Sequence, residues 1–269
     1  MSDSVVRFFD LRNPASAYVF GFMQADGHHY AGRGRKGTVT IEIKAQDADV
    51  LRAMQQVIPW RTSITFRSRT TNFAKRADSA VLTLWALEGR ERLLELGLPT
   101  GRKSATVAPP AEPFSHRDYL RGLYDGDGSV GFAVNGMPFL SIVTASPAIA
   151  EFVCAEILRV TGAHRNPRPN NRDGVFNLMI ASDPAAAFAR WLYDDACIAL
   201  ARKRAAALAV GAWTRPEGMR ARSPRKRWTP EEDAVVMQMT RKEAAERLGR
   251  TVSSVNVRIW RLRQIVNVI

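Results

Sequence analysis

Two aspartates, Asp26 and Asp127, could form a catalytic centre, because each closes a short apolar run and is followed by glycine. The runs span residues 19–27 and 120–128. Hard divalent cations prefer carboxylate oxygens as ligands, and cations held in this way can activate water for hydrolysis. If the two runs meet in the folded chain, the two acids form a candidate metal-dependent hydrolytic site.

Helices are the elements expected to position these acids. An apolar run with a glycine near its middle and Asp-Gly at its end predicts a buried helix whose last turn presents the acid. Gly21 and Gly122 occupy equivalent places in the two runs. A glycine inside a helix costs about 1 kcal/mol relative to alanine, and close approach of two helix backbones is the natural compensation. The repeat therefore predicts a helix-pair interface with two carboxylates at one end.

Both nonapeptides resemble the signature of the LAGLIDADG homing endonucleases, in the single-chain form that carries two copies. The resemblance extends from about residue 15 to about residue 211. It implies an α+β fold in which two pseudo-symmetric αββαββα halves, residues 1–108 and 114–212, pack through the motif helices. The first copy departs from the pattern, since Gln24 stands where the second copy has Asp125.

The same resemblance implies the catalytic residues. Asp26 and Asp127 would bind divalent metal together with the main-chain carbonyls of Ala25 and Gly126. Mg²⁺ is the expected ion, and Mn²⁺ or Ca²⁺ could occupy the same sites. Lys103 and Lys203 have almost the same separation along the chain as the two acids. By the resemblance, they would polarise solvent near each scissile phosphate and complete the catalytic set. The alternative is direct contact with phosphate.

Periodicity predicts the remaining elements of both halves. Ser16 is a plausible N-cap for the first motif helix. In the first half we expect strands at 38–44, 62–69 and 79–86 and helices at 47–58 and 88–96. In the second half we expect strands at 129–134, 138–144, 163–168 and 174–181, helices at 147–160 and 183–194, and a last helix beginning at Arg202.

The charge balance points to nucleic acid as the partner. The chain has 39 Lys and Arg against 26 Asp and Glu, a net charge of +13, spread over many segments. Such a surface binds phosphates through counterion release, although a merely basic soluble protein is the alternative. We expect DNA contacts from hairpin tips, strand faces and loops, with Lys75 and Arg76 in a loop. The expected contacts are Arg33, Arg35, Lys36, Lys44, Arg61, Arg67, Arg69, Lys75, Arg76, Arg165, Arg168 and Arg172.

The composition changes from Trp213 onward. Residues 213–227 predict a linker and residues 228–269 three short helices, the first opening with Trp-Thr-Pro-Glu-Glu-Asp. This opening and the later Ala-Ala-Glu-Arg-Leu-Gly turn resemble a small all-α helix-turn-helix domain of the Myb or SANT-like kind. Its third helix would place Arg258 and Arg261 in a DNA groove. A protein-binding module is the alternative reading. The predicted apolar stripe of that helix is Val252, Val255, Ile259 and Leu262.

Other classes of protein are disfavoured. Cys154 and Cys197 are isolated, which argues against a zinc site or a disulfide. No secretory signal and no spanning helix is evident, so we expect a cytoplasmic protein of a prokaryotic or phage-type system. We expect it to act as a monomer, with double-stranded DNA as its partner.

The expected function is a site-specific homing endonuclease that makes metal-dependent double-strand breaks in a long target, as in intron homing. Two alternatives share the fold: a transcription regulator that no longer cleaves, and an intron RNA maturase. Retention of both acids and both lysines favours the nuclease.

Overall fold

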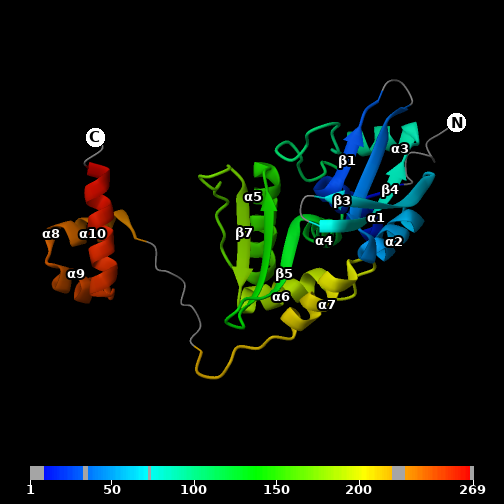
Figure 1. Cartoon of the computed structure of the whole chain (residues 1–269). Helices are drawn as coiled ribbons and strands as arrows, with labels where there is room; N and C mark the ends of the chain where they lie inside the picture. The colour runs from blue at the N-terminus through cyan, green and yellow to red at the C-terminus, as the bar shows by residue number, and fades with distance from the viewer. Residues whose placement is uncertain (1–8, 33–35, 72–73, 220–227, 267–269) are drawn as a thin grey trace. The chain divides into compact units, whose positions relative to one another are not determined.

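The chain forms two compact units, residues 1–216 and 217–269, and the boundary falls inside the expected linker. In the computed structural model, the described residues are 9–32, 36–71, 74–219 and 228–266. Within them lie ten α-helices, one 3-10 helix and seven strands in two sheets, a mixed α+β architecture (Figure 1). No helix in this described part is long and apolar enough to cross a membrane.

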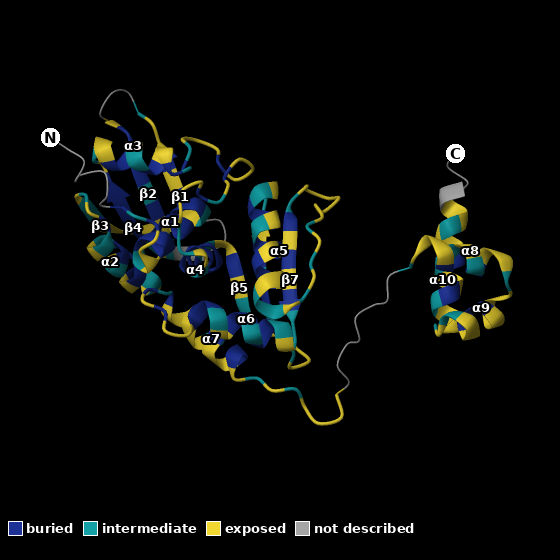
Figure 2. Cartoon of the chain, turned by 180° about the vertical axis from the view of Figure 1, so that it is seen from behind, coloured by how far each residue is buried: buried dark blue, intermediate teal, exposed yellow. Residues whose placement is uncertain are grey.

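The two motif helices lie side by side between the two sheets (Figures 1 and 2). They are α1 (Pro14–Asp26) and α4 (His116–Asp127). Both are buried along most of their length, and in α4 the buried positions include the charged residues Asp118, Arg121 and Asp125. The predicted Ser16 cap is wrong: the Asn13 side chain accepts from the main-chain N–H groups of Ala15 and Ser16. Pro14 fixes the start there, because its φ suits a first helical position that needs no N–H.

The first sheet has one strand more than the three expected from periodicity. Its strands are β1 (Gly27–Tyr30), β2 (Thr38–Lys44), β3 (Thr62–Thr71) and β4 (Ala74–Leu84), antiparallel in the order β1-β2-β4-β3. A 3-10 turn (Ala45–Asp47) and α2 (Ala48–Val57) link β2 to β3, and α3 (Leu87–Glu95) follows β4. The expected loop at Lys75 and Arg76 is wrong. Pairing continues to Thr71↔Ala74, so both residues belong to β4.

The second sheet has one strand fewer than predicted. Strands β5 (Gly128–Phe132), β6 (Pro138–Thr144) and β7 (Phe176–Ala181) pair in that order, with α5 (Pro147–Thr161), α6 (Asp183–Tyr193) and α7 (Ala201–Gly211) around them. The predicted strand at 163–168 is wrong, since these residues form no strand and the isolated bridge Pro169↔Phe176 comes after them. Pro167 and Pro169 carry no N–H, so a ladder at alternate residues cannot form.

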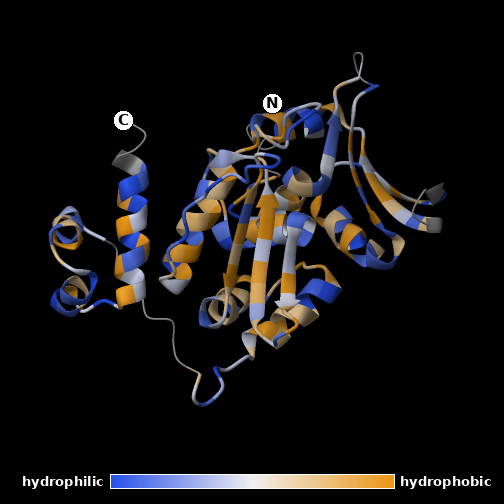
Figure 3. Cartoon of the chain, turned by 60° about the vertical axis from the view of Figure 1, so that its left-hand side comes forward, coloured by the Kyte–Doolittle hydropathy of each residue, from blue (hydrophilic) through white to orange (hydrophobic). Residues whose placement is uncertain are grey.

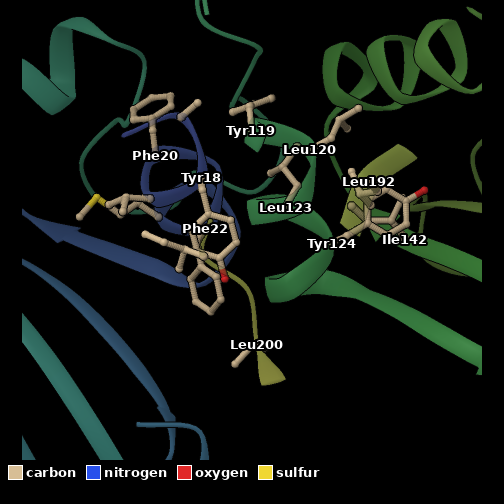
Figure 4. Close-up of a cluster of buried hydrophobic side chains, with 14 of the residues drawn as sticks. Tyr18, Phe20, Phe22, Tyr119, Leu120, Leu123, Tyr124, Ile142, Leu192 and Leu200 are labelled. Atoms are coloured by element: carbon tan, nitrogen blue, oxygen red, sulfur yellow. The ribbon is translucent and has the colours of Figure 1, made fainter. Parts of the chain in front are cut away.

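One hydrophobic core joins both halves of the larger unit. Aromatic and leucine side chains of α1 and α4 meet in it, among them Tyr18, Phe22, Tyr119 and Leu123 (Figure 4). Residues from the segments around α6 and α7, such as Leu200, close the same cluster. The motif helices are therefore held from all sides, and their ends have fixed positions.

The C-terminal unit contains α8 (Pro230–Gln238), α9 (Arg241–Leu248) and α10 (Val252–Val266) around a small core of its own. Capping boxes at Thr229 and Thr240 start the first two helices. Along α10, hydrophobic and hydrophilic residues alternate (Figure 3). Val255 and Ile259 are buried as predicted, whereas Val252 is exposed, because it lies in the first turn ahead of the core contacts.

Candidate active site

Asp26 and Asp127 are the last residues of α1 and α4, and both side chains reach solvent. The two helix ends meet directly: a Cβ placed on Gly126 would overlap the Cβ of Ala25 and would lie 3.5 Å from Oδ2 of Asp26. The carboxylate of one motif therefore faces the main chain of the other. This geometry brings the two predicted acids to one junction.

Glycines allow the helices to come this close. A Cβ on Gly21 would overlap the carbonyl oxygen of Tyr119, and a Cβ on Gly122 would overlap that of Tyr18 and lie 2.7 Å from the main-chain nitrogen of Phe22. Real Cβ atoms do not approach backbone atoms in this way. Gly21 and Gly122 thus lie at the helix contact, in equivalent positions.

Both acids at the junction have raised pKa values. Partial burial raises the pKa of Asp26 above its ordinary value, while the charges of Lys203 and Lys103 oppose that rise. Partial burial also raises the pKa of Asp127, and the negative charge of Asp26 raises it further. A carboxylate whose proton affinity is raised by a neighbouring negative charge gains from a positive charge placed beside it.

Gln24 and Asp125, which occupy equivalent positions in the two motifs, are both buried and hydrogen-bonded. Oε1 of Gln24 accepts from the Tyr119 hydroxyl at 2.5 Å, and Nε2 of Gln24 donates to the carbonyls of Gly97 (2.8 Å) and Ala108 (3.0 Å). The first half surrounds this position with carbonyl acceptors, so an amide is required there.

The carboxylate of Asp125 is surrounded by hydrogen-bond donors instead of acceptors. It accepts from the hydroxyls of Tyr18 and Tyr193 and from the main-chain N–H of Leu200, each at 2.7 Å. Burial raises the pKa of Asp125 and these three hydrogen bonds lower it. Each motif helix therefore sends a tyrosine hydroxyl, Tyr18 or Tyr119, to the polar residue of the other motif. The difference between the motifs follows from the local donors and acceptors, not from the chemistry at the acids.

The two lysines expected near the scissile phosphates lie at the ends of the motif helices that carry the acids. Lys103 and Lys203 are 8% and 6% exposed, and both ammonium groups point into the C-terminal ends of the motif helices. Lys103 Nζ donates to the carbonyls of Gln24 (2.5 Å) and Ala25 (2.7 Å). The carbonyls around Lys203 Nζ are those of Tyr124 (2.8 Å), Asp125 (2.7 Å), Gly126 (3.3 Å) and Gly128 (2.7 Å).

Each lysine thus caps the helix that carries one acid. Burial lowers the pKa of both ammonium groups, and the nearby aspartates raise it. A cation at a helix C-terminus is favourable because the terminal carbonyls carry partial negative charge. Direct contact between either Nζ and a phosphate would require these buried hydrogen bonds to break. The equal spacing predicted the equivalence of the lysines but not their position.

Arg121 is a buried anchor that the sequence reading missed. Its side chain is fully buried inside α4 and donates to the carbonyls of Ile198 (2.8 Å) and Leu192 (3.0 Å), and it pairs with Asp118 one turn earlier. These bonds tie the second motif helix to the segments around α6 and α7. The available signal was an arginine three residues after an aspartate, the spacing of an ion pair on one face of a helix.

The donor set fits a hard cation with few protein ligands. No group of three or more His, Cys, Asp or Glu side chains gathers within the described ranges, so the two aspartates are the charged ligands on offer. The Ala25 and Gly126 carbonyls each accept from a lysine, yet a carbonyl oxygen has a second lone pair. Mg²⁺ is suited to such a sparse shell, because it keeps several waters and takes substrate phosphate oxygens.

Several predicted DNA contacts of the first half lie on one surface. By strand register, Lys44, Arg67 and Arg69 share the face of the first sheet that is turned away from the core. Lys36 and Arg61 are exposed beside strands β2 and β3. The other predictions of this half are placed as follows: Lys75 and Arg76 lie in β4, and Arg33 and Arg35 fall outside the described residues.

The predicted contacts of the second half do not lie on a sheet face. Arg165, Arg168 and Arg172 belong to the irregular segment between α5 and β7. Arg165 Nε donates to the Met179 carbonyl at 2.9 Å, and Arg172 pairs with Asp173 at 2.7 Å. Only Arg168 of the three is exposed without such a bond in the described part of the chain.

In the C-terminal unit the two predicted arginines differ. Arg258 is not free, because it makes two hydrogen bonds to Asp233, at 2.6 and 2.5 Å, which join α10 to α8. Arg261 is exposed.

The comparisons with known proteins agree with this geometry. Residues 115–191 match the family model described as the LAGLIDADG-like domain, a stretch that begins at the second motif helix and includes Asp127. The second half contains a LAGLIDADG-like domain. The family resemblance is confirmed there, and the first motif lies outside the matched range.

Solved structures extend the likeness to both halves. The chain is similar to the homing endonuclease I-WcaI bound to its DNA recognition sequence, with a TM-score of 0.53 and 8% identity over 77% of this chain and 92% of that chain. The match shows that the larger unit has the LAGLIDADG fold.

Two further solved structures are similar to the chain. Full-length DUF199/WhiA from Thermatoga maritima has a TM-score of 0.45 and 12% identity over 95% of this chain and 92% of that chain. The LAGLIDADG homing endonuclease I-GzeII in complex with its DNA target has a TM-score of 0.45 and 12% identity over 72% and 87%. No curated protein sequence matches the chain.

Proposed function

We propose that this protein is a site-specific endonuclease that makes metal-dependent double-strand breaks in a long DNA target. The observation that carries the proposal is the junction of α1 and α4, where two buried helices present Asp26 and Asp127 together at the surface. The net charge of +13 supports DNA as the partner. The fold is shared with I-WcaI, whose structure contains its DNA recognition sequence.

Asp26 and Asp127 would hold the metal, with the Ala25 and Gly126 carbonyls as nearby oxygens. A divalent cation such as Mg²⁺ would supply an activated water and stabilise negative charge on the attacked phosphate. The chain's own residues contribute by holding the two acids in position. Glycine contacts and buried helices fix where the acids stand, and Lys103 and Lys203 hold the last turns of α1 and α4 in helical geometry. In this account the two lysines are positioning residues.

We also propose that the halves are pseudo-symmetric copies and that one chain acts as a monomer. The exchanged tyrosine hydrogen bonds, the paired glycines and the paired lysine caps support a common origin for the two motifs. Because one chain supplies both acids, a second copy is not needed to complete the junction.

The C-terminal unit would add a tethered DNA contact. In α10, Val255 and Ile259 face the small core, so Asn256, Trp260 and Arg261 remain exposed for a groove. A third helix that shows a polar and aromatic face is the arrangement expected of a recognition helix. With Arg258 engaged by Asp233, we assign base or phosphate contacts to Arg261.

The test compares variants on a DNA target selected with the full-length protein. Asp26→Asn and Asp127→Asn remove the charge that would hold the cation while keeping the shape of the side chain. Asp49→Asn, at an exposed position of α2 where the carboxylate pairs with Arg52, removes the same charge outside the junction and serves as the control. We expect all variants to bind, and only the wild type and the control to cut. Cleavage by Asp127→Asn at the wild-type rate would refute the assignment of the acids.

A second measurement does not depend on cleavage. Mg²⁺ that binds only the folded protein raises its melting temperature, by an amount that grows with concentration above Kd. We expect this rise in the wild type and in Asp49→Asn, and its loss when Asp26 and Asp127 are both replaced by Asn. An equal rise in all proteins would place the metal elsewhere.

One observation favours a second candidate, a DNA-binding regulator that does not cleave. Both carbonyls expected to join the metal shell already accept from a lysine ammonium group, so the junction carries two fixed positive charges of its own. In that case the protein would bind its target, Mg²⁺ would leave the melting temperature unchanged, and the bound DNA would stay intact.

A further inference from the structure

The outward faces of the two sheets in the larger unit differ in chemistry. Strands β5, β6 and β7 contain no charged residue, whereas β2 and β3 carry Glu42, Lys44, Arg67 and Arg69. Register places all four on the face turned away from the core. If DNA lies along both sheets, its two halves meet different surfaces.

The first sheet presents an arginine cluster, defined here as Arg67 and Arg69 with Glu42. Glu42 accepts from the Ser79 hydroxyl at 2.6 Å, and its Oε2 lies 3.9 Å from Arg67 Nη1 and 3.6 Å from Arg69 Nη2. The arginine side chains remain about half exposed, at 47% and 54%. Arginine matches the O6 and N7 acceptors of guanine, and a carboxylate accepts from the N4 amino group of cytosine. Such a cluster is suited to G·C pairs.

The second sheet presents a neutral patch, defined here as Ser141, Val143, Asn177 and Met179. Val143 lies directly opposite Asn177, and Ser141 lies opposite Met179, on the outward face. Val143 is 43% exposed and Met179 is 49% exposed, which leaves two apolar side chains in solvent. Apolar groups recognise the thymine methyl group, and asparagine matches N6 and N7 of adenine. This patch is suited to A·T pairs.

One arginine lies beside the neutral patch without entering it. Arg165 is held by its hydrogen bonds to the Met179 and His164 carbonyls, at the edge of β7. A guanidinium at that rim can contact phosphate, while the face beside it stays uncharged.

We infer that the two sheets read different base pairs, so that the DNA target has G·C pairs in the half that meets the arginine cluster and A·T pairs in the half that meets the neutral patch. The inference rests on the proposed DNA-binding function.

Selection from a random duplex library tests it, with the full-length protein and EDTA present to prevent cutting. We expect an enriched sequence with one G·C-containing half and one A·T-rich half. Failure to enrich any sequence would contradict the proposed function itself. Enrichment of a site whose halves have the same composition would overturn this inference while leaving site-specific DNA binding in place.

Base analogues then test the contacts without altering the protein. Uracil in place of thymine removes only the 5-methyl group, and we expect about a fourfold loss of affinity for each methyl contact in the A·T half. Replacing guanine by 7-deazaguanine removes the N7 acceptor, and we expect about a tenfold loss in the G·C half. Each analogue placed in the other half should have little effect. Uracil substitution without effect in the A·T half would refute methyl recognition.

Variants assign each half to its sheet. In Val143→Ala and Met179→Ala the penalty for uracil should shrink, while the penalty for 7-deazaguanine persists. In Arg67→Ala the reverse is expected. Both penalties unchanged in all three variants would show that other residues read the bases.

Discussion

Replacing Gly122 by alanine should destabilise the protein, although the same change in an open helix would stabilise it. In open space, alanine is better than glycine by about 1 kcal/mol. Here the new Cβ would overlap the Tyr18 carbonyl oxygen and approach the Phe22 nitrogen to 2.7 Å, so the two motif helices must separate. Overpacking of this kind costs about 3 kcal/mol at the upper end of its usual range, and rigid backbone atoms favour that end. The net loss is about 2 kcal/mol.

A loss of this size lowers the melting temperature of a domain of this length by about 4–8 °C. Thermal and denaturant unfolding measure it, with Gly131→Ala as the matched control, because the nearest atom to a Cβ there is 3.9 Å away. The control should be as stable as the wild type or slightly more stable. Gly21→Ala should behave like Gly122→Ala, and the double variant should lose less than the sum, since both changes open one interface. A Gly122→Ala protein as stable as the wild type would show that the helices do not meet as described.

The remaining predictions concern the caps, the acids and the tail. Lys203→Met leaves several buried carbonyls of α4 without a donor and should cost about 2–4 kcal/mol of unfolding free energy, whereas Arg204→Met at the exposed neighbouring position should cost little. The pKa of Asp127 in the folded protein is raised above its ordinary value of 3.8, so the folded state binds this proton more tightly than the unfolded state does. The free energy of unfolding therefore falls as pH rises from 3.8 through the folded-state pKa. In EDTA, Asp127→Asn should therefore melt higher than the wild type at pH 7, and the difference should vanish below pH 3.8; a lower melting temperature at pH 7 would contradict the shift. A protein of residues 1–216 should keep its Mg²⁺ response and should bind its target with a slope of log K against log salt that is shallower by about 0.9 for each lost phosphate contact; unchanged slope and affinity would mean that the tail does not bind DNA.

The motif helices could be predicted because their signals are local. An apolar run, a central glycine and a terminal Asp-Gly specify a buried helix, and the repeat specifies its partner. The hydrogen-bond partners of Lys103 and Lys203 could not be predicted, because spacing along the chain does not reveal whether an ammonium group points outward to solvent or inward to a helix end. Only the fold shows that each lysine reaches the last turn of a motif helix.

Other errors have equally specific causes. The missing strand at 163–168 follows from Pro167 and Pro169, whose effect on the ladder outweighs the alternating pattern. The ion pair between Arg258 and Asp233 could not be predicted, because a groove-facing position cannot be distinguished from one that faces Asp233 until α8 and α10 are placed together. Side-chain partners that lie far apart in sequence are the part of the site that periodicity leaves undetermined.

Sequencing of the DNA ends produced by the full-length protein tests the central claim most directly. The protein is incubated with a large library of duplex targets and Mg²⁺, and all new ends are mapped. We expect paired ends on both strands at one defined sequence, present with the wild type and with Asp49→Asn, and absent with Asp26→Asn, with Asp127→Asn or in EDTA. Recovery of a specifically bound sequence with both strands intact in Mg²⁺ would contradict the endonuclease assignment.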